Sequence, residues 1–163
     1  MGTPQTHAAL DKASSHSVLE DQRMPVKAKL AAAWTSFMFL YVYVDILVLF
    51  WKPGVIEGIL AGTVWGLAIG QTPATVALAL MAIPIFMVVL SITLPTRANR
   101  VTNLIVASVQ IPYAAFNAVG ESWTYFYGLS IGLEVLLLAF ILRTSWTWTR
   151  RSSSPATSAA GAH

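Results

Sequence analysis

Two acidic residues lie inside stretches of the chain that are otherwise apolar enough to cross the hydrocarbon core of a lipid bilayer. Glu134 lies near the middle of the run 123–142, and Asp45 lies roughly two helical turns from the end of the run 30–51. An ionisable side chain within a bilayer costs about 2.5–3.5 kcal/mol on insertion scales, so both residues are functional candidates. A carboxyl group at such a depth can join helices by hydrogen bonding, carry a proton or cation in a relay, or anchor the polar head of a lipid or quinone.

Amide side chains recur at a fixed spacing in another apolar run. Asn103, Gln110 and Asn117 are each seven residues apart. Seven residues are close to two helical turns, so the three amides form one polar stripe along a helix face. Counted along the chain, Asn117 lies at a depth similar to that of Tyr127 and Asp45. We therefore expect a polar interior that faces one side of the membrane.

The run 123–142 also carries a polar face, and Glu134 is its last member. Tyr127, Ser130 and Glu134 stand at positions i, i+3 and i+7, on one side of a helix. The connection at 120–122 is short, which favours an antiparallel pair of helices. At 1.5 Å per residue, the depths of Gln110 and Glu134 then differ by about 3 Å. We expect a hydrogen bond between these two side chains.

Signals of enzyme chemistry are weak. The chain has no cysteine, and its histidines are His7, His16 and His163, outside every apolar run. Thiolate sites, Cys-x-x-Cys redox chemistry and histidine-held haem or zinc are therefore excluded within the apolar runs. Phosphate-binding loops and nucleophile elbows are also absent. We expect a protein that is not an enzyme and that uses no metal and no cofactor.

The composition indicates a membrane protein. Of the 163 residues, 56 % are hydrophobic and only 10 % are charged, against about 25 % charged in soluble domains. The net charge of +3 does not indicate a nucleic-acid partner, because so few charges are present. The expected partners are the lipid bilayer and either another membrane protein or further copies of this chain.

Four runs reach the length of about 20 apolar residues that a membrane-spanning helix needs. They lie at about 30–51, 75–94, 101–119 and 123–142. Pro84 and Pro112 fall inside the second and third runs, where we expect kinks that the neighbouring helices tolerate. The predicted fold is an all-α integral membrane four-helix bundle, with an additional short interfacial or re-entrant helix between the first two spans.

The predicted transmembrane domain covers 27–148, and both flanking segments are polar. Residues 1–26 and 149–163 have too few apolar side chains to offset the entropy of ordering, so we expect a disordered arm and a disordered tail. No signal peptide is expected, because the first apolar run is long enough to span rather than to be cleaved.

The basic residues predict the orientation. Nine of the ten lie before the first run, between the second and third, or after the fourth, and only Lys52 lies on the opposite side. By the positive-inside rule, both termini are cytoplasmic and the chain makes four passes. We expect a multi-pass protein of the bacterial plasma (inner) membrane.

The segment between the first two spans is too apolar for an ordinary loop. We expect a helix at about 54–70 on the outer face, because a fifth span would place Arg97 and Arg100 outside. Its glycines recur every four residues, which would place them along one helix face for close packing, with a ligand-lining role as the alternative. They are Gly54, Gly58, Gly62, Gly66 and Gly70.

The remaining acidic residues are candidates on the outer face. Glu57 follows Pro53 near the predicted start of the outer helix, where its charge complements the helix dipole. Glu121 lies in the loop before the fourth run. Lys52, seven residues after Asp45, is a candidate partner for that carboxylate, since a long side chain can snorkel; a functional role for Asp45 is the alternative.

Aromatic side chains gather where the runs end. Residues 120–127 hold a dense aromatic set, and tryptophans stand at Trp34 and Trp51. Tryptophan and tyrosine favour the headgroup level of a bilayer, so we interpret these residues as interfacial belts.

Several stretches together resemble a small bacterial family of four-pass integral membrane proteins, catalogued as a domain of unknown function. The most specific stretch is Pro53–Gly62, preceded by Tyr41-x-Tyr43-x-Asp45. Further matches are Met81-Ala82-Ile83-Pro84, Asn99-Arg100 in the predicted inner loop, and Asn117 with Gly120-Glu121-Ser122-Trp123. The resemblance covers about residues 28–148. It implies the four-pass topology and no activity.

Three functional hypotheses follow from these observations. The first is an accessory or interaction subunit whose outward-facing polar cavity holds a lipid-like ligand. The second is a small proton- or cation-coupled transporter or channel, acting as a homo-oligomer with Glu134 and Asp45 as ion sites. The third is a membrane subunit that handles quinones or redox chemistry. The candidate polar cluster consists of Asp45, Gln110, Asn117, Tyr127 and Glu134.

Overall fold

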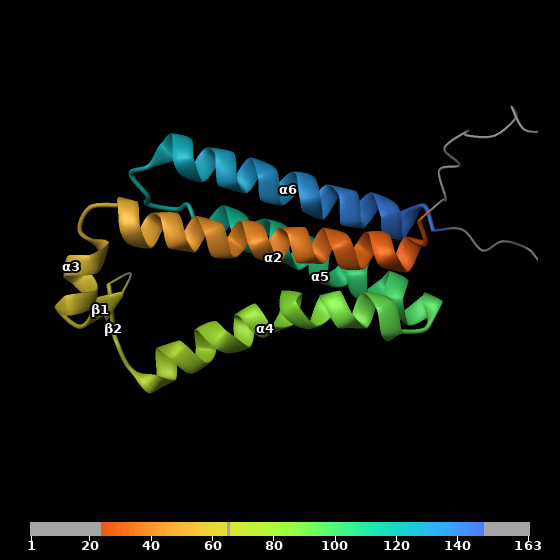
Figure 1. Ribbon diagram of the computed structural model, residues 1–163, viewed down its shortest axis with the longest axis horizontal. Coiled ribbons are helices and arrows are strands. Elements are labelled where there is room, and N and C mark those ends of the chain that lie inside the picture. Colours follow the sequence, from red (N-terminus) through yellow and green to blue (C-terminus); the bar gives the residue numbers. More distant parts are fainter. Residues whose placement is uncertain (1–23, 65, 149–163) are drawn as a thin grey trace, which may run out of the picture.

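A computed structural model describes residues 24–64 and 66–148 (Figure 1). The elements are α2 (Val26–Trp51), α3 (Val55–Leu60), β1 (Thr63–Val64), β2 (Leu67–Ala68), α4 (Gln71–Thr93), α5 (Thr96–Phe116) and α6 (Thr124–Trp146). The predicted disordered arm and tail, 1–26 and 149–163, lie almost entirely outside the described residues.

The four long helices run alternately in opposite directions (Figure 1). Helix α2 packs against α4 and α6, and α5 packs against α6. One end of the molecule therefore holds the start of α2, the end of α4, the start of α5 and the end of α6. We call it the basic end, because it carries Lys27, Lys29, Arg97, Arg100 and Arg143. The opposite end, with α3 and the two short strands, is the α3 end.

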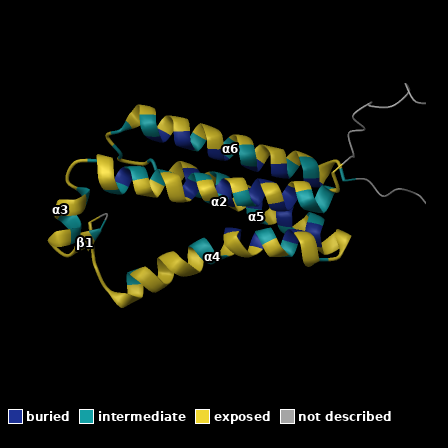
Figure 2. Cartoon of the chain, in the orientation of Figure 1, coloured by how far each residue is buried: buried dark blue, intermediate teal, exposed yellow. Residues whose placement is uncertain are grey.

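The hydrophobic core lies towards the basic end. Leu30, Trp34, Phe37, Leu138 and Ile141 pack together there with almost no exposed surface. The rings of Trp34 and Phe37 meet edge to face, with centroids 5.7 Å apart. Figure 2 shows the same distribution: buried positions concentrate in the half near the chain ends, whereas the first half of α4 is almost wholly exposed.

Three helices, α2, α4 and α6, are long and apolar enough to cross a membrane. The fourth predicted span corresponds to α5, which has 21 residues but is more polar. Its amide side chains lie on the inner side of the molecule, since Asn99, Asn103 and Gln110 are all buried, whereas Arg97 and Ser108 are exposed. Helix α5 is thus apolar outside and polar inside.

The predicted helix bounds need correction at the basic end. The third run was expected to begin at 101, with Asn99 in a loop, but α5 begins at Thr96 and the link from α4 is only Leu94–Pro95. Pro95 lacks an N–H and cannot continue α4. Pro84 and Pro112 lie inside helices as predicted, and α4 bends about midway along its length (Figure 1).

The predicted outer helix at 54–70 is wrong beyond residue 60. Helix α3 has six residues and is followed by an antiparallel pair in which Thr63 lies opposite Ala68 and Val64 opposite Leu67. Gly54, Gly62 and Gly66 have φ values of 86°, 82° and 77°, a left-handed conformation that glycine adopts without steric cost. These glycines bend the chain and form no helical packing stripe; only Gly58 lies within a helix, and Gly70 is extended.

Candidate functional site

A closed network of buried polar groups joins three helices near the basic end. Trp34 Nε1 donates to Asn103 Oδ1 at 2.7 Å. Asn103 Nδ2 donates to the carbonyl and the side-chain oxygen of Asn99 at 2.9 and 2.6 Å. Asn99 Nδ2 in turn donates to the Ser91 carbonyl at 2.5 Å. Because each donor nitrogen and the Asn103 carbonyl have partners within the network, it stabilises the contact of α2, α4 and α5.

Sequence reasoning missed this network in two ways. Trp34 was interpreted as an interfacial residue, but it is fully buried. Asn99 was assigned to a loop, and only Asn103 was placed on a polar helix face. The signal was the spacing of Asn99 and Asn103, four residues apart, which puts both amides on one side of a helix that starts before them.

A second polar cluster lies farther towards the α3 end, between α2, α5 and α6. Tyr127, Ser130 and Glu134 are all buried on the inner face of α6. Asn117, just past the end of α5, donates through Nδ2 to the Tyr41 hydroxyl at 2.6 Å. Sequence reasoning had placed Tyr41 near Asp45 but had not paired it with Asn117.

The expected hydrogen bond between Gln110 and Glu134 is not formed. Both side chains are buried, with 8 % and 5 % of their surfaces exposed. Within the part of the chain that the structure describes, neither forms a side-chain hydrogen bond to the other. The carboxyl of Glu134 and the amide of Gln110 therefore retain hydrogen-bonding capacity inside the molecule.

Asp45 lies outside this interior. Its residue is exposed on the surface of α2, although it remains within electrostatic range of Glu134 and Tyr41. Its candidate partner Lys52 pairs with Glu121 instead. Asp45 is thus exposed near the cluster, whereas Gln110, Tyr127 and Glu134 are buried within the molecule.

An apolar groove lies between α4 and α5. Its volume is about 270 Å³, and it is open to the side because the first half of α4 diverges from the other helices (Figure 1). Gln110 and Tyr113 supply its polar groups. The lining residues are Leu80, Ile83, Ile105, Val106, Val109, Gln110 and Tyr113.

An ion pair closes the α3 end between two loops. Lys52, at the end of α2, donates to the Glu121 carboxylate, and its ammonium lies 5.5 Å from the centre of the Tyr127 ring. The hydrogen bond to Glu121 is the main cause that raises the pKa of Lys52 above its ordinary value of 10.5. Lys52 therefore stays charged over the physiological range. The pair ties the loop after α2 to the loop before α6.

Glu57 stands apart from these groups. It lies in the first turn of α3, where its charge complements the helix dipole, but its side chain makes no hydrogen bond to the N-cap. Within the described residues, no three His, Cys, Asp or Glu side chains come close enough to hold a metal ion.

Comparison with known proteins identifies the family and no more. Residues 19–154 match a family described as "Family of unknown function (DUF6326)". The chain belongs to this family. No curated protein and no solved structure matches the chain. Membership of DUF6326 thus bears out the resemblance to a family of unknown function, and the function must be argued from the geometry of the groove and the polar cluster.

Proposed function

We propose that this member of DUF6326 is a non-enzymatic, four-pass protein of the bacterial plasma membrane that holds a lipid-like ligand and acts as an accessory or interaction subunit. The observation that carries the proposal is the lateral groove between α4 and α5, with Gln110 in its wall. The proposed ligand has an apolar tail and a head that exchanges hydrogen bonds.

The distribution of polarity supports four passes. Helices α2, α4 and α6 suit a bilayer by length and composition. Helix α5 presents Val101, Ile105 and Val109 outwards and its amides inwards, which is how polar residues are placed in membrane helices. It can therefore face lipid on one side, even though its overall composition is less apolar.

The charges support a cytoplasmic basic end. The described cations other than Lys52 lie at or near that end, whereas Glu57 and Glu121 lie at the α3 end. An excess of lysine and arginine marks the cytoplasmic side of membrane proteins. Under this orientation the groove opens into the bilayer from the middle of the membrane towards its outer side.

The groove suits an amphiphile because of the mixture of groups in its lining. Ligand sites are mainly apolar, with a few polar groups that fix orientation. A carboxamide such as Gln110 has both a donor and an acceptor, and neither bonds to another residue in the part of the chain that the structure describes. Because the groove opens sideways, a ligand dissolved in the bilayer can enter without crossing water.

A photo-crosslinking experiment tests the proposal. The full chain is placed in vesicles of phosphatidylethanolamine and phosphatidylglycerol that contain a trace of phospholipid with a diazirine on its acyl chain. After irradiation, peptides that carry the lipid are mapped by mass spectrometry. We expect adducts concentrated on the groove-facing parts of α4 and α5.

A matched pair of substitutions gives the control. Val109 lines the groove and Val101 does not, and the two valines lie on the same helix with 62 % and 54 % of their surfaces exposed. Val109→Trp should fill the groove and remove the adducts on α4 and on the α4-facing side of α5, whereas Val101→Trp should leave them. Adducts spread evenly over all outward faces, or unchanged in Val109→Trp, would contradict the proposal.

A second candidate function rests on Glu134. Its buried carboxyl has no ion-pair partner within the described residues, and Asp45 is an electrostatic neighbour. Such an arrangement is typical of proton or cation sites in transporters, here in a homo-oligomer. A transporter predicts that Glu134→Gln abolishes flux driven by a pH gradient in proteoliposomes, while an accessory subunit predicts no such flux in the parent protein.

A further inference from the structure

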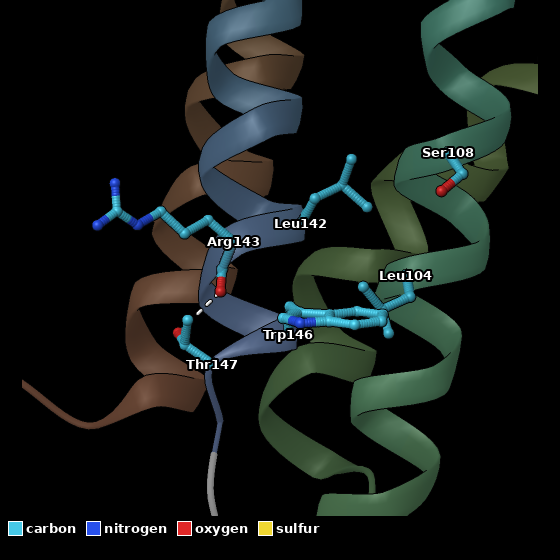
Figure 3. A pocket seen from close by; sticks show the side chains of 6 residues that line it. All are labelled: Leu104, Ser108, Leu142, Arg143, Trp146 and Thr147. Atoms are coloured by element: carbon cyan, nitrogen blue, oxygen red, sulfur yellow. Dashed lines mark hydrogen bonds between the residues drawn. The ribbon is translucent and has the colours of Figure 1, made fainter.

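A second groove lies at the basic end, between α5 and α6 (Figure 3). Its volume is about 480 Å³, larger than that of the α4–α5 groove. The lining is mostly apolar and consists of Leu104, Ser108, Leu142, Arg143, Trp146 and Thr147. Figure 3 shows the Trp146 ring extending from α6 towards Leu104 on α5, so that the indole forms one end of the groove.

A cation lies at this end of the groove. The guanidinium of Arg100 is 5.9 Å from the centre of the Trp146 ring, within the range of a cation–π contact. Arg100, Leu104 and Ser108 are each four residues apart, so they share one face of α5. Arg143 is also a lining residue, but its guanidinium points away from Leu104 and Trp146 in Figure 3; it therefore adds charge to this end without placing that charge in the groove.

The charge at the basic end is not balanced by the described residues. The described residues include four acidic ones, and all lie in the half towards the α3 end or in mid-helix: Asp45, Glu57, Glu121 and Glu134. Arg100 forms no ion pair with any described residue. A guanidinium in a cation–π contact keeps the N–H donors in its plane for a planar or tetrahedral anion.

We propose that the α5–α6 groove binds one anionic phospholipid from the leaflet at the basic end, with an acyl chain between Leu104, Ser108 and Leu142 and the phosphate at Arg100. Basic pockets between membrane helices on the cytoplasmic side recognise anionic headgroups. Trp146 separates the two parts of the site, as tryptophan does at the boundary between acyl chains and headgroups. This site is distinct from the α4–α5 groove; it rests on the membrane insertion proposed above and not on the ligand proposed for that groove.

Native mass spectrometry of the full chain in detergent micelles tests this proposal. Dioleoyl phosphatidylglycerol and dioleoyl phosphatidylcholine are added separately over a range of concentrations. We expect tighter binding of phosphatidylglycerol, by about fivefold, since one cation near an anionic headgroup contributes about that factor. Soluble glycerol phosphate should not displace the lipid, because it lacks the chain that the groove holds.

Two substitutions and one control test the headgroup part and the acyl-chain part of the site separately. Arg100→Gln should remove the preference for phosphatidylglycerol, whereas Arg97→Gln, an exposed arginine one turn earlier, should keep it. Ser108→Trp should block the chain and weaken binding of both lipids. Each variant is first checked for helix content by circular dichroism. Equal binding of the two lipids by the parent, an unchanged preference in Arg100→Gln, unaltered binding in Ser108→Trp, or displacement by glycerol phosphate would each overturn the proposal.

Discussion

Towards the basic end, Trp34, Asn99 and Asn103 share short hydrogen bonds in which every donor has a partner. Towards the α3 end, Gln110 and Glu134 are buried without a hydrogen bond to each other, and α4 diverges to leave a groove. Buried polar residues thus occur in both halves of the molecule, but the amides near the basic end bond to one another, whereas Gln110 and Glu134 do not. Near the basic end the exception is Ser145, whose buried hydroxyl has no partner among the described residues.

This difference separates a structural use of polar residues from a functional one. A complete network fixes helix positions and leaves nothing for a ligand. Polar groups beside a lateral groove, with unused donors and acceptors, are what a ligand site requires. The first half of α4 can diverge because, on this account, its exposed apolar residues face lipid, so the separation exposes no apolar surface to water.

The largest expected effect distinguishes the two ends of the molecule. The chain contains no cysteine, so single cysteines can be introduced at Ser122, before α6, and at Ala98, in the first turn of α5. If the basic end is cytoplasmic, an impermeant maleimide should label Ser122→Cys in intact cells and Ala98→Cys only after permeabilisation. Labelling in the opposite pattern would reverse the orientation.

The next effect concerns stability in the two halves. Asn103→Leu removes the acceptor of Trp34 and the donor to Asn99, so we expect a loss of about 2 kcal/mol in the free energy of unfolding. Asn117→Leu removes one bond, to Tyr41, and should cost about 0.6 kcal/mol. Unfolding by sodium dodecyl sulfate in mixed micelles measures both. Equal losses would show that the two halves do not differ in this way.

The smallest effect concerns the ion pair that closes the α3 end. The variants Lys52→Met and Glu121→Gln, made singly and together, should give a coupling energy of about 0.5–1 kcal/mol in a double-mutant cycle. Because the pKa of Lys52 is raised, this contribution should be complete below the ordinary value of 10.5 and lost as the pH rises through the raised value. A coupling energy that disappears between pH 7 and pH 9 would contradict this assignment.

The sequence predicted best the features that long apolar runs and helical spacing specify. The four long helices lie close to the predicted runs, since apolar length is a robust signal. The inner faces of α5 and α6 were also predictable, because Asn103 with Gln110, and Tyr127 with Glu134, follow helical spacing. The resemblance to a family of unknown function was confirmed by the match over residues 19–154.

Other features depend on information that spacing does not contain. The glycines at 54–70 recur with helical spacing, but the positive φ angles of Gly62 and Gly66 form turns, and spacing cannot distinguish the two uses. The partner of Lys52 is Glu121, far away in the chain, because folding brings two loops together. Pro84 predicts a bend in α4, but the direction of the bend, and with it the groove, depends on packing between helices, which a single sequence does not show.

The central claim is that the α4–α5 groove holds a lipid-like molecule, and native mass spectrometry of protein extracted in lipid discs tests it most directly. No probe is added, so the measurement reports what the membrane supplies. The account predicts a co-purifying small molecule in the parent and in Val101→Trp that is lost in Val109→Trp, while any phospholipid at the α5–α6 groove stays bound in all three proteins. A parent protein without such a molecule, or one that is retained equally in Val109→Trp, would contradict it.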